Sequence, residues 1–444
     1  MQRKIEAKLV EWKNKTAGRM PLLLYGARQV GKTYILDNFG AGHFRNVVNI
    51  NLETNLSVAR YFEDDISPER IVRFLETVVN EVITPGKTLI IFDEIQSCER
   101  ALTSLKYFCE QAPEYHVAAA GSLFHPTKSA DFAETPMLGV AINREHFSFP
   151  VGKVESLTLH PLDFEEFLWA LGERRLAEEI RGCYAELRPM PEALHRKAIE
   201  LYRTYLIVGG MPACVDVFAK ARKTVLIPGI QNEIINNYVA DMAKYAELSD
   251  TVKIRACYES IPAQLAKENK KFQYKVVQRG GSATLFGPSI EWLAQAGVVL
   301  KCKKLDHAFN PIAVYTDLSS FKLYLSDVGL LTMRAGIPQQ TVLSGESNLF
   351  MGSVAENYIA QSLAANGRPL YYWASENTSE LDFVLQDGTD IIGVEVKKGI
   401  KTRSRSLSVF TQKYAPAWSI RFSEKNFGAE GNVRAVPHYA AFCV

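Results

Sequence analysis

One short segment constrains the fold of this chain more than any other. Residues 26–33 read Gly-Ala-Arg-Gln-Val-Gly-Lys-Thr and match the pattern G-x-x-x-x-G-K-[ST]. The apolar run Leu22–Tyr25 precedes this pattern, and a helical stretch of residues 33–39 follows it. A buried strand, a glycine-rich loop and a helix in this order are typical of a phosphate-binding loop (P-loop). The sequence therefore predicts an α/β domain with a nucleotide site.

Each residue type in this loop suits one part of a nucleotide. Glycines allow backbone N–H groups to turn toward phosphate oxygens, Lys32 brings a positive charge to the β- and γ-phosphates, and Thr33 offers a hydroxyl to Mg²⁺. The predicted cofactors are therefore ATP and Mg²⁺. The residues expected to bind the nucleotide are Gly26, Ala27, Arg28, Gln29, Val30, Gly31, Lys32 and Thr33.

A second apolar run, Leu89–Phe92, ends in the carboxylates Asp93 and Glu94. We expect Asp93 to lie in the Mg²⁺ shell together with Thr33. Glu94 is expected to act in catalysis with Lys32, by orienting and polarising the attacking water. An apolar run that ends in two acids is common by itself, but its place after a P-loop in the same domain favours the catalytic interpretation.

Further candidates for contacts with phosphate follow in the sequence. The expected strand at residues 116–120 ends in Gly121 and Ser122, and Ser122 suits either a sensor of the γ-phosphate or a simple turn cap. Arg144 and Lys153 suit either contact with the nucleotide of a neighbouring subunit, which requires a homo-oligomer, or plain surface charge. The sequence does not decide between these alternatives.

The distribution of apolar runs and helical stretches along the chain predicts four parts. Residues 1–160 alternate short apolar runs with helical stretches, which is the pattern of a doubly wound P-loop core. Residues 161–250 are mainly helical and suggest a lid over that core. Residues 251–330 read as three helices followed by a strand ribbon, the pattern of a winged helix. Residues 331–444 mix strands and helices and form a C-terminal α/β part.

The winged-helix segment is a candidate for contact with DNA. It carries basic residues of the kind that neutralise phosphates: Lys267, Lys270, Lys271, Lys275, Arg279, Lys301, Lys303 and Lys304. The expected recognition helix, residues 283–296, is however mostly apolar and poorly suited to reading base edges. DNA contact without sequence preference and pure packing both stay open. Within the same segment, residues 313–315 are expected to form a strand, and the regular part of the third helix is expected to begin only at Pro288.

Taken together, several motifs resemble a known family. They are Gly26–Thr33, Leu89–Glu94, Gly121-Ser122, Pro161–Phe167 and Gly209–Pro212. They are similar to those of archaeal and bacterial AAA-type ATPases that carry a C-terminal domain of unknown function. The resemblance implies a nucleotide-driven switch or motor. That family often has Gly-Arg where this chain has Gly152-Lys153, which weakens an arginine-finger role at position 153.

Four residues of the C-terminal part suggest a second centre: Glu356, Asp382, Glu395 and Lys397. Alternation along residues 395–397 places Glu395 and Lys397 on one face of a strand, and a hairpin joins this strand to the one with Asp382. Asp382 and Glu395 are expected to share a metal ion, with Glu356 as a further ligand. Lys397 would then activate water.

This layout resembles the D…E-x-K pattern of the restriction-endonuclease-like fold, PD-(D/E)XK. The E-x-K triplet also occurs at residues 6–8, 11–13 and 268–270, but only the fourth instance follows a strand hairpin. The basic residues after it, Lys398, Lys401, Arg403 and Arg405, suit either a phosphodiester backbone or a solvated loop. Cleavage of DNA and binding without cleavage are both compatible with this pattern.

Composition limits the remaining classes. The formal net charge is only +2, so any contact with nucleic acid must come from local patches. The segment Met1–Gly18 reads as an exposed amphipathic helix without the apolar core of a signal peptide, and no apolar run is long enough to cross a bilayer. We therefore expect a cytoplasmic protein without a membrane partner. Three hypotheses stay open: an ATP-regulated nuclease, a non-cleaving ATP-driven switch, and a signalling ATPase with no role on nucleic acid.

Overall fold

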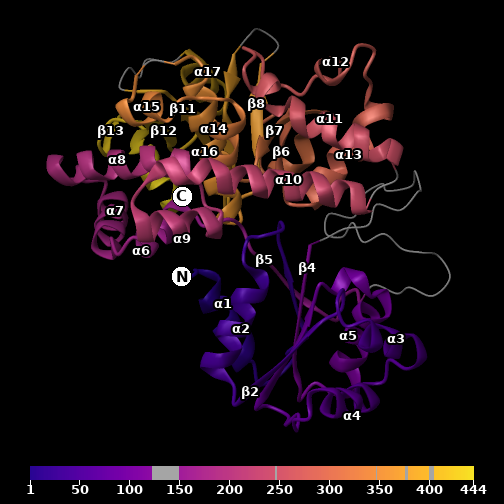
Figure 1. Ribbon diagram of the computed structural model, residues 1–444. Coiled ribbons are helices and arrows are strands. Elements are labelled where there is room, and N and C mark those ends of the chain that lie inside the picture. The colour runs from indigo at the N-terminus through magenta and orange to yellow at the C-terminus, as the bar shows by residue number, and fades with distance from the viewer. Residues whose placement is uncertain (123–149, 246–247, 347, 376–378, 400–404) are drawn as a thin grey trace.

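The computed structural model (Figure 1) describes residues 1–122, 150–245, 248–346, 348–375, 379–399 and 405–444. Its N-terminal part is built around a sheet of five parallel strands in the order β2-β3-β4-β1-β5. The strands are β1 (Leu22–Tyr25), β2 (Asn46–Asn51), β3 (Thr88–Asp93), β4 (His116–Gly121) and β5 (Glu155–Thr158). The predicted doubly wound α/β sheet is thus confirmed, and β1, which precedes the P-loop, lies inside it.

Side chains of these strands alternate between two apolar layers, as the pleat of a strand requires. Leu22 and Leu24 of β1 face the layer that contains helices α1 and α2, whereas Leu23 faces the layer that contains α3, α4 and α5. Figure 1 shows the two groups of helices on opposite sides of the sheet. The helices are α1 (Ile5–Asn14), α2 (Lys32–His43), α3 (Leu56–Asp64), α4 (Pro68–Val79) and α5 (Glu99–Gln111), with the short 3₁₀ helix η1 (Ile95–Ser97) before α5.

The N-terminal helix is amphipathic as expected, but its apolar face is not exposed. Ile5, Leu9 and Trp12 are buried in the core. Arg3 pairs with Glu166 at 3.1 Å, and Lys4 contacts Asp163 and Glu165. The expectation of an exposed helix was wrong because these acids, far away in the sequence, fix the start of the chain to α6.

A layer of helices follows the sheet, as predicted for residues 161–250. Its members are α6 (Phe164–Ala170), α7 (Arg174–Glu186), α8 (Glu192–Val208), α9 (Pro212–Ala221) and α10 (Ile227–Tyr245), with η2 (Thr224–Leu226) before α10. Asp163 caps α6 by accepting a hydrogen bond from the N–H of Glu166, while the Glu166 carboxylate accepts from the N–H of Asp163. The predicted turn at residues 209–212 separates α8 from α9, with Gly209 in the left-handed region at φ +71° and Pro212 in the first turn of α9.

The next segment contains three helices and two antiparallel strands. They are α11 (Leu248–Leu265), α12 (Tyr274–Val277), α13 (Ala283–Gln295), β6 (Val299–Leu305) and β7 (Thr316–Leu325). Helix α13 begins at Ala283 and not at Pro288, because the Ser282 hydroxyl caps its first turn. The expected strand at residues 313–315 was also wrong: Ile312–Tyr315 forms the 3₁₀ helix η3 after Pro311, which has no N–H for a strand ladder.

The C-terminal part shares a sheet with that segment. Strand β6 pairs with β7 on one side and with β8 on the other, in the sheet β7-β6-β8-β9. A second sheet has the order β10-β11-β12-β14-β13. The elements are α14 (Val328–Arg334), α15 (Gln339–Ser344), α16 (Met351–Ala365), β8 (Tyr371–Ala374), β9 (Glu380–Leu381), β10 (Phe383–Asp387), β11 (Asp390–Val396), α17 (Arg405–Tyr414), β12 (Ser419–Ser423), β13 (Gly428–Glu430), β14 (Val433–Pro437) and η4 (His438–Cys443). The boundary expected at residue 330 therefore falls between strands of one sheet.

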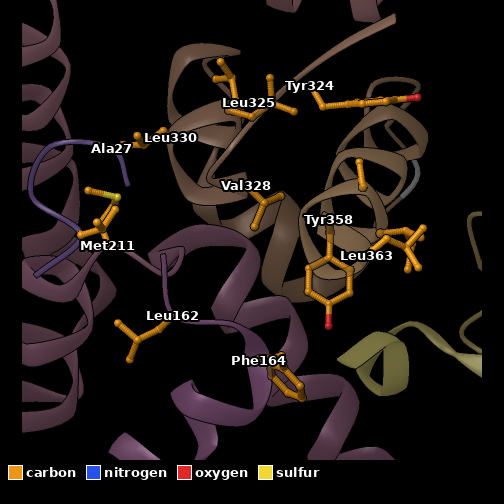
Figure 2. Packing of buried hydrophobic residues seen from close by; sticks show 14 of the residues in the cluster. Ala27, Leu162, Phe164, Met211, Tyr324, Leu325, Val328, Leu330, Tyr358 and Leu363 are labelled. Carbon is orange, nitrogen blue, oxygen red and sulfur yellow. The ribbon is translucent and has the colours of Figure 1, made fainter. Parts of the chain in front are cut away.

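One apolar cluster runs from the P-loop into the C-terminal half. Figure 2 shows members from the P-loop (Ala27), the helical layer (Phe164, Met211) and the C-terminal half (Leu330, Tyr358). Backbone segments approach closely at the glycine after α13: a Cβ atom on Gly297 would lie 3.2 Å from the amide nitrogen of Ala27. The loop expected to hold phosphate thus rests directly against the segment that carries α13 and β6.

Candidate functional site

The P-loop begins at Gly26, directly after the fully buried strand β1. A Cβ atom on Gly26 would lie 2.2 Å from the carbonyl oxygen of Leu159, so no other residue fits there without moving the backbone. At the other end, Gly31 adopts φ +93° and forms the N-terminal boundary of α2. Between the two glycines the side chains of Ala27 and Val30 are buried in the core. The side chains of these two predicted residues therefore anchor the loop to the core.

Lys32 is held inside this loop. Its side chain is buried, and its Nζ donates hydrogen bonds to the carbonyl oxygens of Gly26 (2.9 Å) and Ala27 (3.0 Å). Burial lowers the pKa of Lys32 to about 8, although the carboxylates of Glu94 and Asp93 oppose this shift. The ammonium is thus placed within the loop and depends on nearby negative charge to stay protonated.

The structure brings the two predicted Mg²⁺ residues into contact. The Thr33 hydroxyl at the start of α2 donates to Asp93 Oδ2 at the end of β3, at 3.0 Å. Asn51 at the end of β2 also donates to this oxygen, at 3.4 Å. Sequence reasoning missed Asn51, which lies directly opposite Asp93 in the register of the two strands. A hydroxyl and a carboxylate are the oxygen ligands that Mg²⁺ prefers, so this pair fits the ion.

Glu94 directly follows Asp93 and lines the same pocket. Its backbone is in the left-handed region at φ +50°, which is uncommon for a residue with a side chain. Its carboxylate accepts a hydrogen bond from the amide nitrogen of Gln96. The end of β3 therefore places the Asp93 carboxylate against Thr33 and the Glu94 side chain in the pocket.

The pocket has a volume of about 550 Å³. One wall is the P-loop with the start of α2, and the opposite wall is α10. The residues that line it are Arg28, Gln29, Gly31, Lys32, Thr33, Tyr34, Glu94, Asn237, Ala240 and Asp241. The three residues of α10 were missed by sequence reasoning, because they lie some 200 positions away and belong to no motif.

An ion pair spans the two walls of this pocket. Arg28 Nε lies 2.6 Å from Asp241 Oδ2, and an Arg28 nitrogen also lies 3.7 Å from Glu53. Lys244, one turn further along α10, contacts Glu53 as well. Burial raises the pKa of Asp241 to about 6, although Arg28 opposes this shift. The P-loop and α10 are thus tied together by charge at the place where a nucleotide would enter.

The other predicted phosphate contacts lie in different surroundings. Ser122 is buried at the end of β4, and its hydroxyl has no partner among the residues that the structure describes. Lys153 pairs with Glu110 at 3.1 Å and does not line the pocket. Arg144 lies outside the described residues.

The residues of the C-terminal centre make two sets of contacts. Glu356 on α16 is buried and accepts hydrogen bonds from Lys270, from Lys322 at 3.0 Å and from the Tyr324 hydroxyl. Although burial opposes it, the ammonium groups of Lys270 and Lys322 hold the pKa of Glu356 well below its usual range. Lys322 is fully buried and also pairs with Glu380 at 2.6 Å. Two lysines therefore already neutralise the carboxylate that was expected to be a metal ligand.

The second set involves the E-x-K triplet. Glu395 pairs with Lys397 at 3.2 Å, which fits the prediction that both lie on one face of β11. Glu395 also lies 3.4 Å from Arg421. Asp382 Oδ2 accepts from the backbone N–H of Val396 at 2.8 Å, so Asp382 lies beside the triplet. Burial and the charge of Glu356 raise the pKa of Asp382 to about 7.

Within the described ranges, no group of three or more histidine, cysteine or acidic side chains is arranged so that it could hold a metal ion. Glu356, Asp382 and Glu395 each have protein partners instead. Asp382 thus lies beside the E-x-K strand, but the charges of Glu356 and Glu395 are balanced by cations of the chain itself.

The basic residues of the winged-helix segment are partly engaged as well. Lys270 pairs with Glu356, Lys301 with Glu291, and Lys304 with Asp306. The expected recognition helix α13 buries Phe286, Ile290, Trp292 and Leu293. In the C-terminal basic run, Lys398 donates to the carbonyl of Asn348 at 2.6 Å, whereas Lys401 and Arg403 lie outside the described residues. These contacts favour the packing interpretation of α13.

Comparisons with known protein families divide the chain into three matched regions. Residues 18–168 match an AAA domain, residues 199–341 match a domain of unknown function (DUF8612), and residues 351–440 match another domain of unknown function (DUF4143). The N-terminal third of the chain is therefore an AAA-type P-loop ATPase domain with a nucleotide-binding fold. The C-terminal region is a DUF4143 domain.

Two curated relatives are uncharacterized proteins of Mycobacterium bovis and Mycobacterium tuberculosis, each 34% identical over 79 residues. The match covers 17% of this chain and 18% of each relative, so the chain spans less than a fifth of their length.

Among solved structures, a Walker-type ATPase of Pyrococcus abyssi is similar at 14% identity and a TM-score of 0.42, over 75% of this chain and 95% of that one. AMPPCP-bound DnaA of Aquifex aeolicus is similar at 13% identity and a TM-score of 0.28, over 65% of this chain and 86% of that one. None of the helices in the described part of this chain has the length and apolar character needed to span a membrane.

Proposed function

We propose that this protein is a Mg²⁺-dependent ATPase whose nucleotide state repositions its C-terminal half. The observation that carries the proposal is the hydrogen bond between Thr33 and Asp93 beside the buried ammonium of Lys32. Thr33 and Asp93 would hold Mg²⁺, which supplies positive charge to the phosphate oxygens when bound.

The chain's own residues would perform four tasks. The backbone N–H groups between Gly26 and Gly31 would bind phosphate oxygens at the start of α2. Lys32 would release the carbonyl oxygens that it now contacts and bind the β- and γ-phosphates instead. Glu94 would orient the attacking water and accept its proton. Asn51 would hold the Asp93 carboxylate in place.

Two contacts offer a route from the nucleotide to the rest of the chain. Helix α10 forms one wall of the pocket and packs against α11 and α14 of the C-terminal half. The backbone of Ala27 also lies against Gly297, between α13 and β6. A shift of the P-loop or of α10 on ATP binding would therefore move the segment that shares a sheet with β8.

For the C-terminal domain we propose binding without cleavage. A metal-dependent nuclease needs carboxylates with uncompensated negative charge, whereas Glu356 is neutralised by Lys270 and Lys322, and Glu395 also contacts Arg421 outside the triplet. A nuclease is the second candidate, favoured by one observation: Asp382 lies next to the E-x-K strand through its bond to Val396.

The ATPase is tested by steady-state turnover of ATP with Mg²⁺. We expect Lys32→Ala to bind ATP at least about tenfold more weakly. We expect Glu94→Gln to keep binding but lose turnover. Lys220→Ala and Glu69→Gln are matched controls, because both side chains are exposed and distant from the pocket. Turnover that is unchanged in Glu94→Gln would contradict the assigned role of this residue.

The C-terminal role is tested by incubating wild-type protein and Lys397→Ala with linear, supercoiled and single-stranded DNA and Mg²⁺ or Mn²⁺. We expect no cutting of any form. Cutting that is lost in Lys397→Ala would establish the nuclease and overturn the non-cleaving proposal. Filter binding of the same DNA, with and without ATP, then decides whether the partner of this domain is a nucleic acid or a protein.

A further inference from the structure

Gln96 lies between the proposed catalytic carboxylate and the end of a neighbouring strand. It belongs to the short helix η1, two residues after Glu94. Its amide nitrogen donates a hydrogen bond to Glu94 Oε2. Because Glu94 has an uncommon left-handed backbone, its side chain points away from the course of β3, and Gln96 holds the carboxylate in that direction.

The other end of the Gln96 amide faces β4. A Cβ atom on Gly121, the last residue of β4, would lie only 2.5 Å from Gln96 Oε1 and 3.2 Å from the Cγ2 atom of Ile95. The amide therefore packs directly against the backbone of Gly121, in space that any other residue at this position would occupy. Gln96 thus bridges the ends of two adjacent strands, β3 and β4.

The oxygen of this amide, Gln96 Oε1, is buried and lacks a partner among the described residues. A buried polar group without a hydrogen bond is costly, and native structures rarely retain one. The amide nitrogen keeps its bond to Glu94 although this orientation leaves the amide oxygen without one.

We propose that Gln96 is a positioning residue for ATP hydrolysis, which holds the Glu94 carboxylate in a fixed direction from the end of β4. This inference rests on the proposed ATPase function. The Gln96 amide is held between Glu94 and the backbone of Gly121, so it fixes the direction of the carboxylate that orients water.

A glutamine that only fills space would leave the chemical step unchanged, so the test separates kcat from KM. We expect Gln96→Leu to lower kcat roughly 10- to 100-fold, because displacement of a reacting group by about 1 Å has an effect of this size. The KM for ATP and the affinity for a fluorescent nucleotide should stay within about twofold of wild type, since Gln96 does not line the pocket. Gln111→Leu at the exposed end of α5 is the matched control and should not change either constant.

A second variant guards against loss of folding in Gln96→Leu. Gly121→Ala keeps the glutamine but places a methyl group where Gln96 Oε1 lies, and the flexible end of that side chain is free to yield. It should lower kcat with the same unchanged KM, and the effects of Gly121→Ala and Gln96→Leu should not add in the double variant.

The outcomes distinguish this inference from its premise. If the wild-type protein turns over ATP and both Gln96→Leu and Gly121→Ala keep a normal kcat, the role of Gln96 is refuted while the ATPase stands. If both variants change KM and kcat by the same factor, Gln96 is structural and the inference is also refuted. If folded wild-type protein binds ATP but never hydrolyses it, the proposed ATPase fails and this inference fails with it.

Discussion

Asp241 places a negative charge in the pocket that is expected to accept a triphosphate. It lies on α10 and pairs with Arg28 of the P-loop at 2.6 Å. An incoming triphosphate would repel Asp241 and attract Arg28, so this ion pair must weaken when the nucleotide binds. Replacing Asp241 by asparagine removes the repulsion and takes away one of the carboxylates that hold Arg28. We therefore expect Asp241→Asn to bind ATP more tightly than wild type.

The size of the effect follows from the surroundings of the pair. The side chains of Arg28 and Asp241 are 26% and 10% exposed, between a surface pair and a buried one. Exposed pairs contribute about 0.2–1 kcal/mol, whereas breaking a buried pair costs about 3–5 kcal/mol, so an intermediate value of about 1–2 kcal/mol is reasonable here. This corresponds to an affinity for ATP that is roughly 5- to 30-fold higher in Asp241→Asn.

The assay is titration calorimetry with ATP and Mg²⁺ on wild type, Asp241→Asn and the control Asp216→Asn. Asp216 pairs with Lys220 on the surface of α9 and does not line the pocket, so its variant should bind like wild type. Measurements at several pH values sharpen the test. Because the pKa of Asp241 is raised to about 6, wild type gradually loses this charge below pH 6. The ratio of the two dissociation constants should therefore approach one in acid, while any titration of ATP itself cancels.

Two results would refute this reasoning. If Asp241→Asn binds ATP as wild type does, the Arg28–Asp241 pair is not disturbed by the nucleotide. If Asp241→Asn binds ATP more weakly, the carboxylate assists binding, and α10 stabilises the bound nucleotide instead of opposing it. A ratio of the two dissociation constants that does not change with pH would show that the charge of Asp241 does not cause the difference in affinity.

Three further predictions concern other parts of the molecule. The pKa of Lys32 is lowered to about 8, and only the protonated form of this side chain attracts phosphate. The affinity for ATP should therefore fall by up to about tenfold per pH unit above pH 8. Lys32→Arg should show no such fall, because arginine stays charged. Gly26→Ala should lower affinity for ATP at least about tenfold, because its Cβ collides with Leu159, whereas Gly42→Ala, which has open space around it, should not. Lys322→Met should lower the free energy of unfolding in urea by about 3–5 kcal/mol, and adding Glu356→Leu should recover most of this loss.

The nucleotide site could be predicted because its residues are close together in sequence. Strand β1, the loop and α2 are contiguous, and the second strand ends in adjacent acids. Local pattern and known chemistry were therefore enough to select Lys32, Thr33, Asp93 and Glu94, which the structure brings close together. The helical stretch predicted for residues 33–39 also lies within α2.

The rest of the site depends on contacts between distant segments, which no local pattern reveals. Asp241 reaches the P-loop only because α10 crosses it, and Asn51 reaches Asp93 only through the order of the strands. The same limit applies to the C-terminal centre. Its carboxylates and E-x-K triplet stand out in sequence, but the buried Lys322 that neutralises Glu356 lies on β7, in a segment assigned to another domain. The expected homo-oligomer and cytoplasmic location stay predictions.

The measurement that tests the account most directly is calorimetric titration of ATP with Mg²⁺ into the folded wild-type protein and into Lys32→Ala. The account predicts one ATP per chain for wild type and, since a charged hydrogen bond contributes about 1.5–3 kcal/mol, a dissociation constant at least about tenfold higher in Lys32→Ala. No binding to folded wild-type protein, or equal affinity in the two proteins, would contradict it.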